Sequence, residues 1–363
     1  MRWPAARYCL SGKGTRTADR FYPWRWTSVG GQEQSSDPAI IRVENLEHSY
    51  GNFKAVDGIS FSVKKGEIFS FLGPNGAGKS TAINVLITLL ALQKGKASVA
   101  GYDVTRDPQK VRESIGIVFQ DITLDRDMTV REILEFHGRL YNMPREERNK
   151  RIDELLLLVQ LEAKRNERTK NLSGGMKRRL EIARGLMTRP KVLFLDEPTI
   201  GLDPQTRMRM WEYIKGVNNE GTTIFLTTHY MDEADQLSDR ISIIDQGKIV
   251  ISGTSWELKN TLGRDLIYLE TNNNEAAIRL LKDLPSVRDV KTKTKGFVLM
   301  VNEDGTKVLP IVIDTLRNAG IDSLTINLKK PSMDDVFIFY TGKDLRDEPT
   351  GKAAFLTMRP GGR

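Results

Sequence analysis

The chain has 363 residues, enough for two domains with separate cores. Its net charge of +8 is concentrated at the ends, with +3 in residues 1–37 and +2 in residues 341–363, so the middle keeps only +3 and we expect no nucleic-acid partner. The single cysteine, Cys9, excludes an internal disulfide and a cysteine-based metal site, and no apolar run reaches the about 18 residues of a membrane-spanning helix.

The two ends of the chain differ in composition from its middle. Residues 1–38 show no hydrophobic period and lack the apolar segment of a secretory signal. We expect a disordered tail there, or a misassigned start, and a loose tail over residues 343–363. Residues 39–255 and 256–342 are then expected to form two domains.

A pair of strands opens the first predicted domain. Ile40–Val43 and Ile59–Val63 are rich in β-branched residues, and a turn lies between them at Tyr50–Phe53. We expect an antiparallel β flap. Tyr50 could offer its ring to a flat ligand such as adenine, although an isolated tyrosine is more often a core or edge aromatic.

The stretch Gly73-Pro74-Asn75-Gly76-Ala77-Gly78-Lys79-Ser80-Thr81 matches the phosphate-binding pattern G-x-x-x-x-G-K-[ST] at every fixed position. Glu67–Leu72 before it has the pattern of a buried strand, and Ala82–Ile87 after it that of a helix. This context predicts a loop whose backbone N–H groups and helix N-terminus bind phosphate. Lys79 is expected to reach the terminal phosphates of a nucleoside triphosphate, and Ser80 to hold Mg²⁺.

Two further strands and a charged helical stretch follow. Lys96–Ala100 and Ile115–Phe119 are expected as strands, and the second ends at Gln120. Residues from about 121 to 189 then predict a helical subdomain, inserted into the nucleotide-binding fold.

The inserted stretch contains a second phosphate-binding signal. Ser173-Gly174-Gly175 precedes a predicted helix, Lys177–Met187. A serine cap, two glycines and a helix N-terminus together make an anion site separate from the first. The basic run Lys177-Arg178-Arg179 either adds positive electrostatic field at this anion site or forms a solvated helix face.

Polar residues end two later strands. Val192–Glu197 has four apolar residues before two carboxylates, as in a parallel strand covered on both faces. Asp196 would face the nucleotide and offer a hard oxygen to Mg²⁺. Glu197 is expected to be exposed with a pKa near about 4.3, so it would position a water rather than act as a strong base. The strand Thr222–Thr228 ends at His229, which by itself would more often be structural.

The remaining chain predicts a smaller domain. Strands at Ile241–Ile244 and Lys248–Ile251 are expected to close the first domain. Strands and helices then alternate from about 265 to 340 without a cluster of catalytic residue types, which predicts a small α/β or α+β domain with a regulatory or assembly role. The predicted fold class is therefore α/β, with a mixed sheet core, an antiparallel flap, a helical insertion and this C-terminal domain.

The order of these signals is more specific than any one of them. It runs from the phosphate loop through a strand-end glutamine, Ser-Gly-Gly, Asp-Glu and Gly201-Leu202-Asp203 to a strand-end histidine. Over about residues 40–255 this order closely resembles the ATPase cassette of ABC transporters, a P-loop NTPase. Leu195–Arg207 and the ending Pro331–Phe337 resemble the drug- and antibiotic-export branch, the daunorubicin-resistance type.

The resemblance implies ATP as substrate, Mg²⁺ as cofactor and a role for each matching position. Tyr50 would stack on adenine, and Gly73–Thr81 would be the Walker A loop. Gln120 matches the Q-loop and would join Ser80 and Asp196 around Mg²⁺. Catalysis would rest on Lys79, Gln120, Glu197 and His229.

The resemblance also implies partners. Leu172, Ser173, Gly174, Gly175 and Met176 match the signature, which in this family covers ATP held by another cassette, and Asp203 matches the D-loop that couples the two. Since the chain carries one cassette, a homodimer is implied. A separate transmembrane permease is implied as well, so that this subunit would lie at the cytoplasmic face of the membrane and power export of drugs or other hydrophobic compounds.

Other classes fit less well. The chromosome-associated type places hundreds of coiled-coil residues between the P-loop and the signature, whereas Lys79 and Ser173 are 94 positions apart. The translation type usually has two cassettes. Copper-enzyme maturation, polysaccharide export and sodium export use similar subunits, so the cargo stays open, and a soluble ATP-driven switch that moves no cargo is the alternative from a different class.

Overall fold

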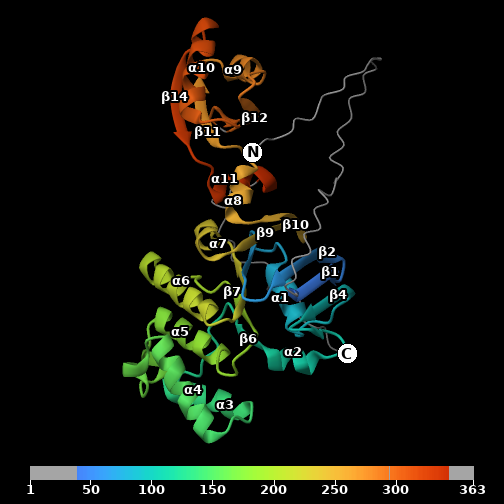
Figure 1. Ribbon diagram of the computed structural model, residues 1–363, viewed down its shortest axis with the longest axis vertical. Helices are drawn as coiled ribbons and strands as arrows, with labels where there is room; N and C mark the ends of the chain where they lie inside the picture. Colours follow the sequence, from blue (N-terminus) through green and yellow to red (C-terminus); the bar gives the residue numbers. More distant parts are fainter. Residues whose placement is uncertain (1–38, 294, 343–363) are drawn as a thin grey trace, which may run out of the picture. The chain divides into compact units, whose positions relative to one another are not determined.

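Three β-sheets and the helices around them make up residues 39–293 and 295–342, which this computed structural model describes (Figure 1). The tails expected over residues 1–38 and 343–363 lie outside the described residues. Within the described ranges, no helix is long and apolar enough to cross a membrane.

The first sheet is the expected antiparallel flap. Its strand order is β2-β1-β4-β5, formed by β1 (Ala39–Tyr50), β2 (Phe53–Lys64), β4 (Lys94–Val99) and β5 (Tyr102–Asp103). Alternate residues of β1 and β2, among them Ile41, Val43 and Val63, are buried against the helix that follows the phosphate loop. The flap thus packs directly against the helix that follows the phosphate loop.

The second sheet is mixed, as predicted, with the order β10-β9-β3-β8-β7-β6. The strands β6, β7, β8, β3 and β9 are parallel, and β10 is antiparallel to β9. The bounds are β3 Ile68–Leu72, β6 Ile115–Val118, β7 Val192–Asp196, β8 Thr223–Thr228, β9 Arg240–Asp245 and β10 Lys248–Gly253. Every residue of β3, β7 and β8 is buried, because helices cover one face and the flap with α1 (Lys79–Leu86) covers the other.

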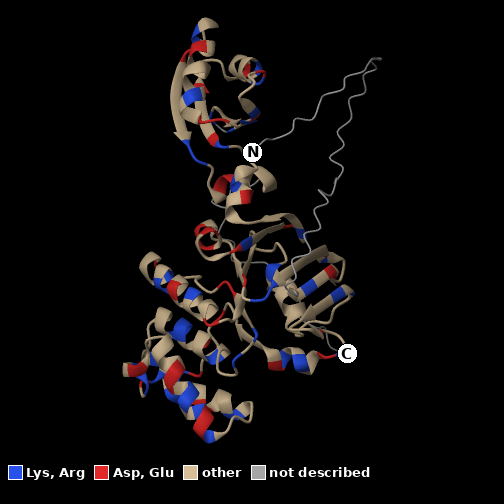
Figure 2. Ribbon diagram, in the orientation of Figure 1, with Lys and Arg blue, Asp and Glu red and all other residues tan. Residues whose placement is uncertain are grey.

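Helices fill the stretch that was expected to be helical. These are α3 (Val130–Leu140), α4 (Arg145–Leu158) and α5 (Gly174–Gly185), while α2 (Pro108–Ser114) and α6 (Pro204–Asn219) flank the stretch. Thr129 and Glu132 form a capping box that fixes the start of α3. Lys, Arg, Asp and Glu are interspersed along these helices (Figure 2), as on solvated helix faces.

The third sheet, in the C-terminal part, is antiparallel throughout with the order β12-β13-β11-β14. The chain runs β11 (Asp265–Thr271), α9 (Asn274–Leu281), β12 (Val287–Thr292), β13 (Phe297–Val301), α10 (Gly305–Asn318) and β14 (Ser323–Lys329). This is a ferredoxin-like arrangement. Of the two expectations for this part, α+β is therefore right and α/β is wrong.

Sequence patterns missed several short elements near this sheet. They are α7 (Met231–Leu237), α8 (Ser255–Asn260), β12 and α11 (Met333–Thr341). The sequence of α11 is rich in aromatic and β-branched residues, which favour strands. A capping box between Ser332 and Asp335 starts the helix nonetheless.

The third sheet uses both of its faces. One face, with Ile267, Leu299 and Val301, packs under α9 and α10. The other, with Leu266, Val298 and Met300, joins a second core that also contains residues of α7, α8, α11 and the strands β3 and β9. The C-terminal sheet therefore shares a continuous apolar core with the helix that follows His229.

Candidate active site

The phosphate loop connects β3 to α1 as predicted. Gly76 and Gly78 have φ angles of 78° and 101°, a region that side chains rarely adopt. A Cβ on Gly78 would lie 2.3 Å from the carbonyl oxygen of Ala55, and one on Gly73 would lie 2.2 Å from that of Ile244. Gly73 and Gly78 are therefore required for close packing against the flap and β9. The loop leads directly into the N-terminus of α1, where phosphate can bind.

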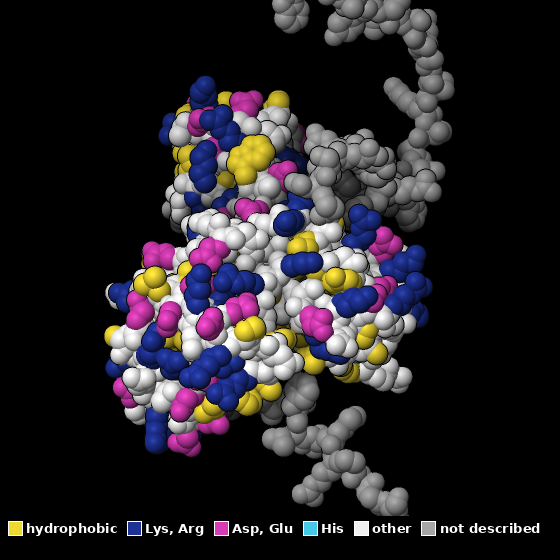
Figure 3. Space-filling model, turned by 60° about the horizontal axis from the view of Figure 1, so that its bottom comes forward, with side chains coloured by type: hydrophobic (Ala, Val, Ile, Leu, Met, Phe, Trp, Pro, Cys, Tyr) yellow, Lys and Arg dark blue, Asp and Glu magenta, His cyan; other side chains and the backbone are white. Residues whose placement is uncertain are grey.

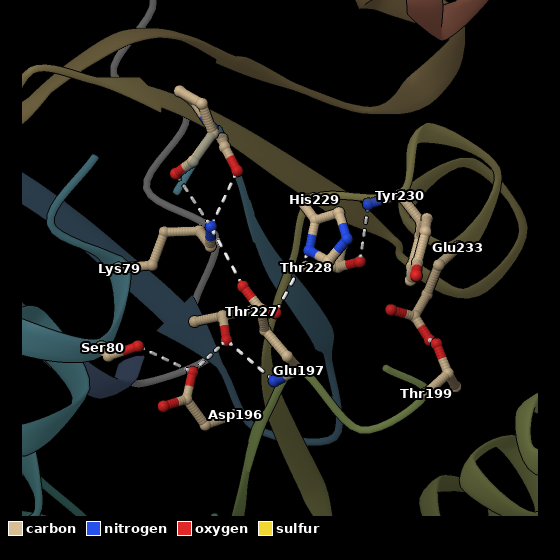
Figure 4. A network of polar contacts seen from close by, with 12 residues as sticks. Lys79, Ser80, Asp196, Glu197, Thr199, Thr227, Thr228, His229, Tyr230 and Glu233 are labelled. Carbon is tan, nitrogen blue, oxygen red and sulfur yellow. Dashed lines mark hydrogen bonds and ion pairs between the residues drawn. The ribbon is translucent and has the colours of Figure 1, made fainter. Parts of the chain in front are cut away.

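Lys79 is buried at the centre of this loop. Its Nζ donates to the carbonyl oxygens of Gly73 and Pro74, at 2.7 and 3.0 Å, and lies 3.3 Å from Glu197 Oε1 (Figure 4). The loop thus surrounds the ammonium group of Lys79, which lies next to the carboxylate of Glu197, the residue after β7. Asn75 and Gly76 are exposed, and Ser80 and Thr81 are half-buried at the start of α1.

Two oxygens suited to a cation lie next to one another. Asp196 Oδ1 accepts hydrogen bonds from Ser80 Oγ at 3.1 Å and from Thr227 Oγ1 at 2.5 Å. A carboxylate and a hydroxyl at the end of a phosphate loop are the hard donors that Mg²⁺ prefers. The residues present therefore fit this ion. Thr227 was not predicted, although its place at the end of a strand beside β7 could have suggested it.

Glu197 is not exposed, contrary to the sequence-based expectation, because only 5% of its surface is accessible. Its carboxylate lies between Lys79 and His229, whose Nδ1 is 3.1 Å from Glu197 Oε2. Burial alone would raise the pKa of Glu197, but His229 and Lys79 together lower it, so the group is ionised at neutral pH.

The backbone of Glu197 is strained. Its φ is 47°, in the left-handed region, which for a non-glycine residue costs about 1–2 kcal/mol. The residue is held there by its own N–H, which donates to Thr227 Oγ1 at 3.1 Å and Thr227 O at 3.2 Å. Such strain concentrates at functional sites, and here it turns the carboxylate toward Lys79.

The helix α7 anchors the residues after Glu197. Glu233 is fully buried, and its Oε1 accepts from Thr199 Oγ1 at 2.8 Å and from Trp211 Nε1 at 3.1 Å. Figure 4 shows Glu233 together with Thr199, whose hydroxyl donates to it. Burial raises the pKa of Glu233, although its hydrogen bonds oppose the shift. Sequence patterns did not indicate this residue.

The Ser-Gly-Gly stretch begins α5 and faces solvent. Ser173 caps the helix, accepting from Met176 N at 3.3 Å, so α5 starts at Gly174, three residues earlier than expected. Ser173 and Gly174 are exposed, and Leu172 is buried. Because α5 packs on β6, α3, α4 and α6, whereas α1 packs on β2, β4 and β7, the two phosphate-binding signals belong to different parts of the fold.

Neither expectation for the basic run after this stretch holds for Arg178. It is 3% exposed and donates to the carbonyl oxygens of Asp196, Glu197, Pro198 and Phe119. Its Nη1 also lies 3.0 Å from Glu181 Oε2, which is itself fully buried. Arg178 thus ties α5 to the ends of β6 and β7. Glu181 lies three residues after Arg178, between Leu180 and Ile182. A charged residue at this spacing could have indicated that Arg178 pairs within the helix and is buried.

The remaining predicted residues lie apart from the carboxylates. Tyr50 is 51% exposed at the end of β1, and its ring contacts that of His48. Gln120 is exposed just after β6, and among the described residues it makes no hydrogen bond. Asp203 caps α6 through Thr206 N, at 3.0 Å. The structure therefore brings together Lys79, Ser80, Asp196, Glu197 and His229, and leaves the other roles as predictions.

Two family models match the chain. The ABC transporter model covers residues 56–200, and the model of the ATP-binding protein DrrA1-3-like C-terminal domain covers residues 253–341. The daunorubicin resistance ATP-binding protein DrrA3 of Streptomyces coeruleorubidus is 40% identical over 84% of this chain and 97% of its own length. The linearmycin resistance ATP-binding protein LnrL of Bacillus subtilis is 38% identical over 85% of this chain and all of its own length.

Solved structures give the same result for the fold. CbiO1 of Clostridium perfringens, part of the ABC transporter complex cbiONQ, is 31% identical with a TM-score of 0.58, and the match covers 69% of this chain and 96% of that one. The dimeric structure of the bacterial ABC transporter cassette MJ0796 is 30% identical with a TM-score of 0.54, covering 59% and 98%.

Proposed function

Because the chain belongs to the ABC transporter family, among the ATP-binding subunits of the drug-resistance type, we propose that it hydrolyses ATP to power export of hydrophobic compounds through a separate membrane permease. Relatives are named for resistance to daunorubicin and linearmycin and for Nod factor export. These names motivate the cargo class proposed here. The subunit would then lie at the cytoplasmic face of the membrane, held there by the permease.

The observation that carries the proposal is the convergence of five side chains at the carboxyl ends of β3, β7 and β8. Lys79 and the loop N–H groups would bind the terminal phosphates. Ser80 and Asp196 would hold Mg²⁺, which when bound neutralises charge on the phosphate oxygens. Tyr50 would support adenine, and Gln120 would complete the site from the end of β6.

The chemical step is assigned to Glu197 and His229. Since its pKa is lowered, Glu197 is an acceptor at neutral pH and would orient the attacking water. His229, 3.1 Å from it, would hold the water and the γ-phosphate in line. Positioning contributes more than basicity in such a reaction, because phosphoryl transfer needs little proton abstraction before the transition state.

The exposed start of α5 supports a head-to-tail homodimer. Ser173 and Gly174 are exposed at the N-terminus of α5 and would form an anion site there. In a two-fold dimer this site would cover the nucleotide bound to the partner's phosphate loop, with Asp203 near the boundary. ATP would therefore be enclosed only when two copies meet.

A glycine substitution tests this dimer. A Cβ on Gly174 meets no atom within 4 Å, and the same holds for Gly216 in α6, which serves as the matched control. Gly174→Ala should fold normally and bind ATP, but the methyl group would displace the partner's nucleotide and reduce hydrolysis by about 10²-fold. Gly216→Ala should match wild type. Hydrolysis by Gly174→Ala at the wild-type rate would refute the shared site.

The permease has a candidate docking groove. A cavity of about 670 Å³ lies between the ends of α1 and β6 and the helix α3, and its lining is mainly apolar. Leu89, Phe136 and Leu140 on it are 60%, 54% and 61% exposed. Hydrophobic side chains gather near the lower edge of the face in Figure 3. Such a groove suits a short amphipathic helix from a cytoplasmic loop of the permease.

Substitution within the groove tests the docking. Phe136→Glu with Leu140→Glu should abolish co-purification with the proposed permease, while ATP binding stays unchanged. Glu146→Lys with Glu147→Lys, on exposed positions of α4 outside the groove, is the control. Retained co-purification by the groove variant would contradict this interface.

A further inference from the structure

A second cavity, of about 520 Å³, lies in the C-terminal part of the chain, between the third sheet and the end of α11. Its volume falls in the range of small-molecule sites, roughly 300–1,000 Å³. None of the residues assigned above to nucleotide, Mg²⁺ or the permease lines it. The cavity therefore needs its own explanation.

The floor of this cavity is apolar. Leu262, Leu266, Val298 and Met300 line it, each at most 4% exposed, and Ile338 of α11 adds a partly exposed wall. Burying an aliphatic or aromatic body against such a floor is favourable, because it removes apolar surface from water.

The rim carries two lysines next to aromatic rings. Lys293 Nζ lies 4.7 Å from the ring centre of Tyr268, and Lys291 Nζ lies 5.0 Å from that of Phe339. Lys291 is exposed, and among the described residues its one carboxylate contact is long, 3.7 Å to Asp289 Oδ2. Among the described residues, the ammonium group of Lys293 has no carboxylate within ion-pair distance. Two positively charged side chains, Lys291 and Lys293, thus line the cavity.

Among the described residues that line the cavity, the one carboxylate is that of Asp335, and it is already paired. Asp335 accepts from Tyr268 Oη at 2.7 Å and from Ser332 Oγ at 2.7 Å, and it lies 2.9 Å from Lys329 Nζ. It cannot neutralise the rim lysines without losing these partners. The cavity therefore combines an apolar interior with an unbalanced positive rim.

We propose that this cavity binds a small amphipathic anion, a single carboxylate on an aliphatic or aromatic body. The carboxylate would lie between Lys291 and Lys293, and the apolar body would fill the space over Leu266, Val298 and Met300. A cationic amphiphile of the same shape would be rejected, because its charged group would meet the same two ammonium groups.

The cavity is placed to influence the ATP site. Its floor belongs to the apolar core that also contains Met231 and Ala234 of α7, together with Val336 and Phe337 of α11. The helix α7 starts two residues after His229 and is further fixed by Asp235, which pairs with Lys259 of α8 at 2.6 Å. Resting on the proposed ATPase function, this inference makes the bound anion a regulator of hydrolysis through α11 and α7.

Binding is tested first, without nucleotide, by titration calorimetry of the full chain below micelle-forming concentrations. Dodecanoate should bind one molecule per chain, about tenfold or more tightly than dodecyltrimethylammonium, whose alkyl tail is one carbon longer and whose charge is reversed. Equal affinity for the two, or binding of several dodecanoate molecules per chain, would overturn the proposal.

Variants separate this site from adventitious binding. Lys291→Ala with Lys293→Ala should weaken dodecanoate binding about tenfold, since two partly exposed ion pairs are lost. Lys282→Ala with Lys295→Ala removes the same charge from exposed positions outside the cavity and should change nothing. Ile338→Trp should block binding by filling the cavity. Unchanged affinity for dodecanoate in both cavity variants would refute the proposed binding site.

Regulation is tested by ATP turnover with and without dodecanoate. Turnover should change on adding dodecanoate in wild type, whereas turnover of Ile338→Trp should be the same with and without dodecanoate. A chain that binds dodecanoate one-to-one yet never hydrolyses ATP would refute the proposed function and leave the binding site standing. A chain that hydrolyses ATP but fails the calorimetry refutes only the cavity proposal.

Discussion

Replacing Arg178 tests how the end of β7 is held. Its guanidinium is buried, pairs with Glu181, and donates to carbonyl oxygens at the ends of β6 and β7. Arg178→Met keeps most of the bulk but leaves the fully buried Glu181 without its main partner. Removing one member of a buried ion pair costs about 3–5 kcal/mol of unfolding free energy.

The surroundings of Glu181 set where in this range the effect should fall. The carboxylate keeps a hydrogen bond from Thr123 N, at 2.8 Å, and a longer contact with Arg184, at 3.7 Å. We therefore expect a loss near the lower end, about 3 kcal/mol. ATP hydrolysis should fall as well, because the carbonyl oxygens of Asp196 and Glu197 lose a donor next to the carboxylate that we propose orients the attacking water.

A double-mutant cycle measured by urea unfolding checks this reasoning. Arg178→Met with Glu181→Leu should be less destabilised than the sum of the two single variants, with a coupling of about 1–3 kcal/mol, since the uncompensated charge is gone. The control is Arg139→Met, which removes a partner of Glu135 from an arginine that is 66% exposed, and it should stay within about 0.5 kcal/mol of wild type. Additive single effects, or a loss below about 1 kcal/mol for Arg178→Met, would refute the buried-pair argument.

Three further predictions concern the site itself. Glu197→Gln should keep nucleotide binding but lower single-turnover ATP hydrolysis by about 10²–10⁴, and a wild-type rate would contradict its role. Gly78→Ala puts a methyl group 2.3 Å from Ala55 O, whereas Gly76→Ala meets no atom within 4 Å, so calorimetry should show a far larger loss of ATP affinity for the first, and equal losses would contradict the packing argument. Since burial raises the folded-state pKa of Glu233 above its ordinary 4.5, the folded chain binds the extra proton and wild-type stability should fall as pH rises above that value. Glu233→Gln should remove this slope in urea unfolding at pH 5 and pH 8, and an unchanged slope would count against it.

Local patterns were sufficient for the elements around the phosphate loop. The glycine loop between Glu67–Leu72 and α1 predicted a phosphate loop, and the apolar run of β7 predicted a buried parallel strand. Both predictions need only consecutive residues, because glycine spacing and a continuous apolar run are local patterns. The same holds for the antiparallel flap and for the cap at Ser173.

Errors arose where distant residues decide the environment. Glu197 was expected to be exposed, yet Lys79 at the start of α1 and His229 just after β8 enclose it. Arg178 was expected either to lie on a solvated helix face or to add positive electrostatic field at the Ser-Gly-Gly stretch. Instead, it is surrounded by four carbonyl oxygens and Glu181. The helix α11 was missed because its aromatic and β-branched residues favour a strand until they pack under the third sheet.

The sequence by itself determined which chemical groups this protein has and in what order, since a glycine loop, a lysine and strand-end carboxylates form a pattern that needs no distant partner. Only the tertiary structure decided which of those groups meet, how deeply Glu197 and Arg178 are buried, and that a positively rimmed cavity shares a core with the helix after His229. The reason is physical: burial, pKa and cavity shape depend on side chains brought together by sheet pairing and packing between segments far apart along the chain.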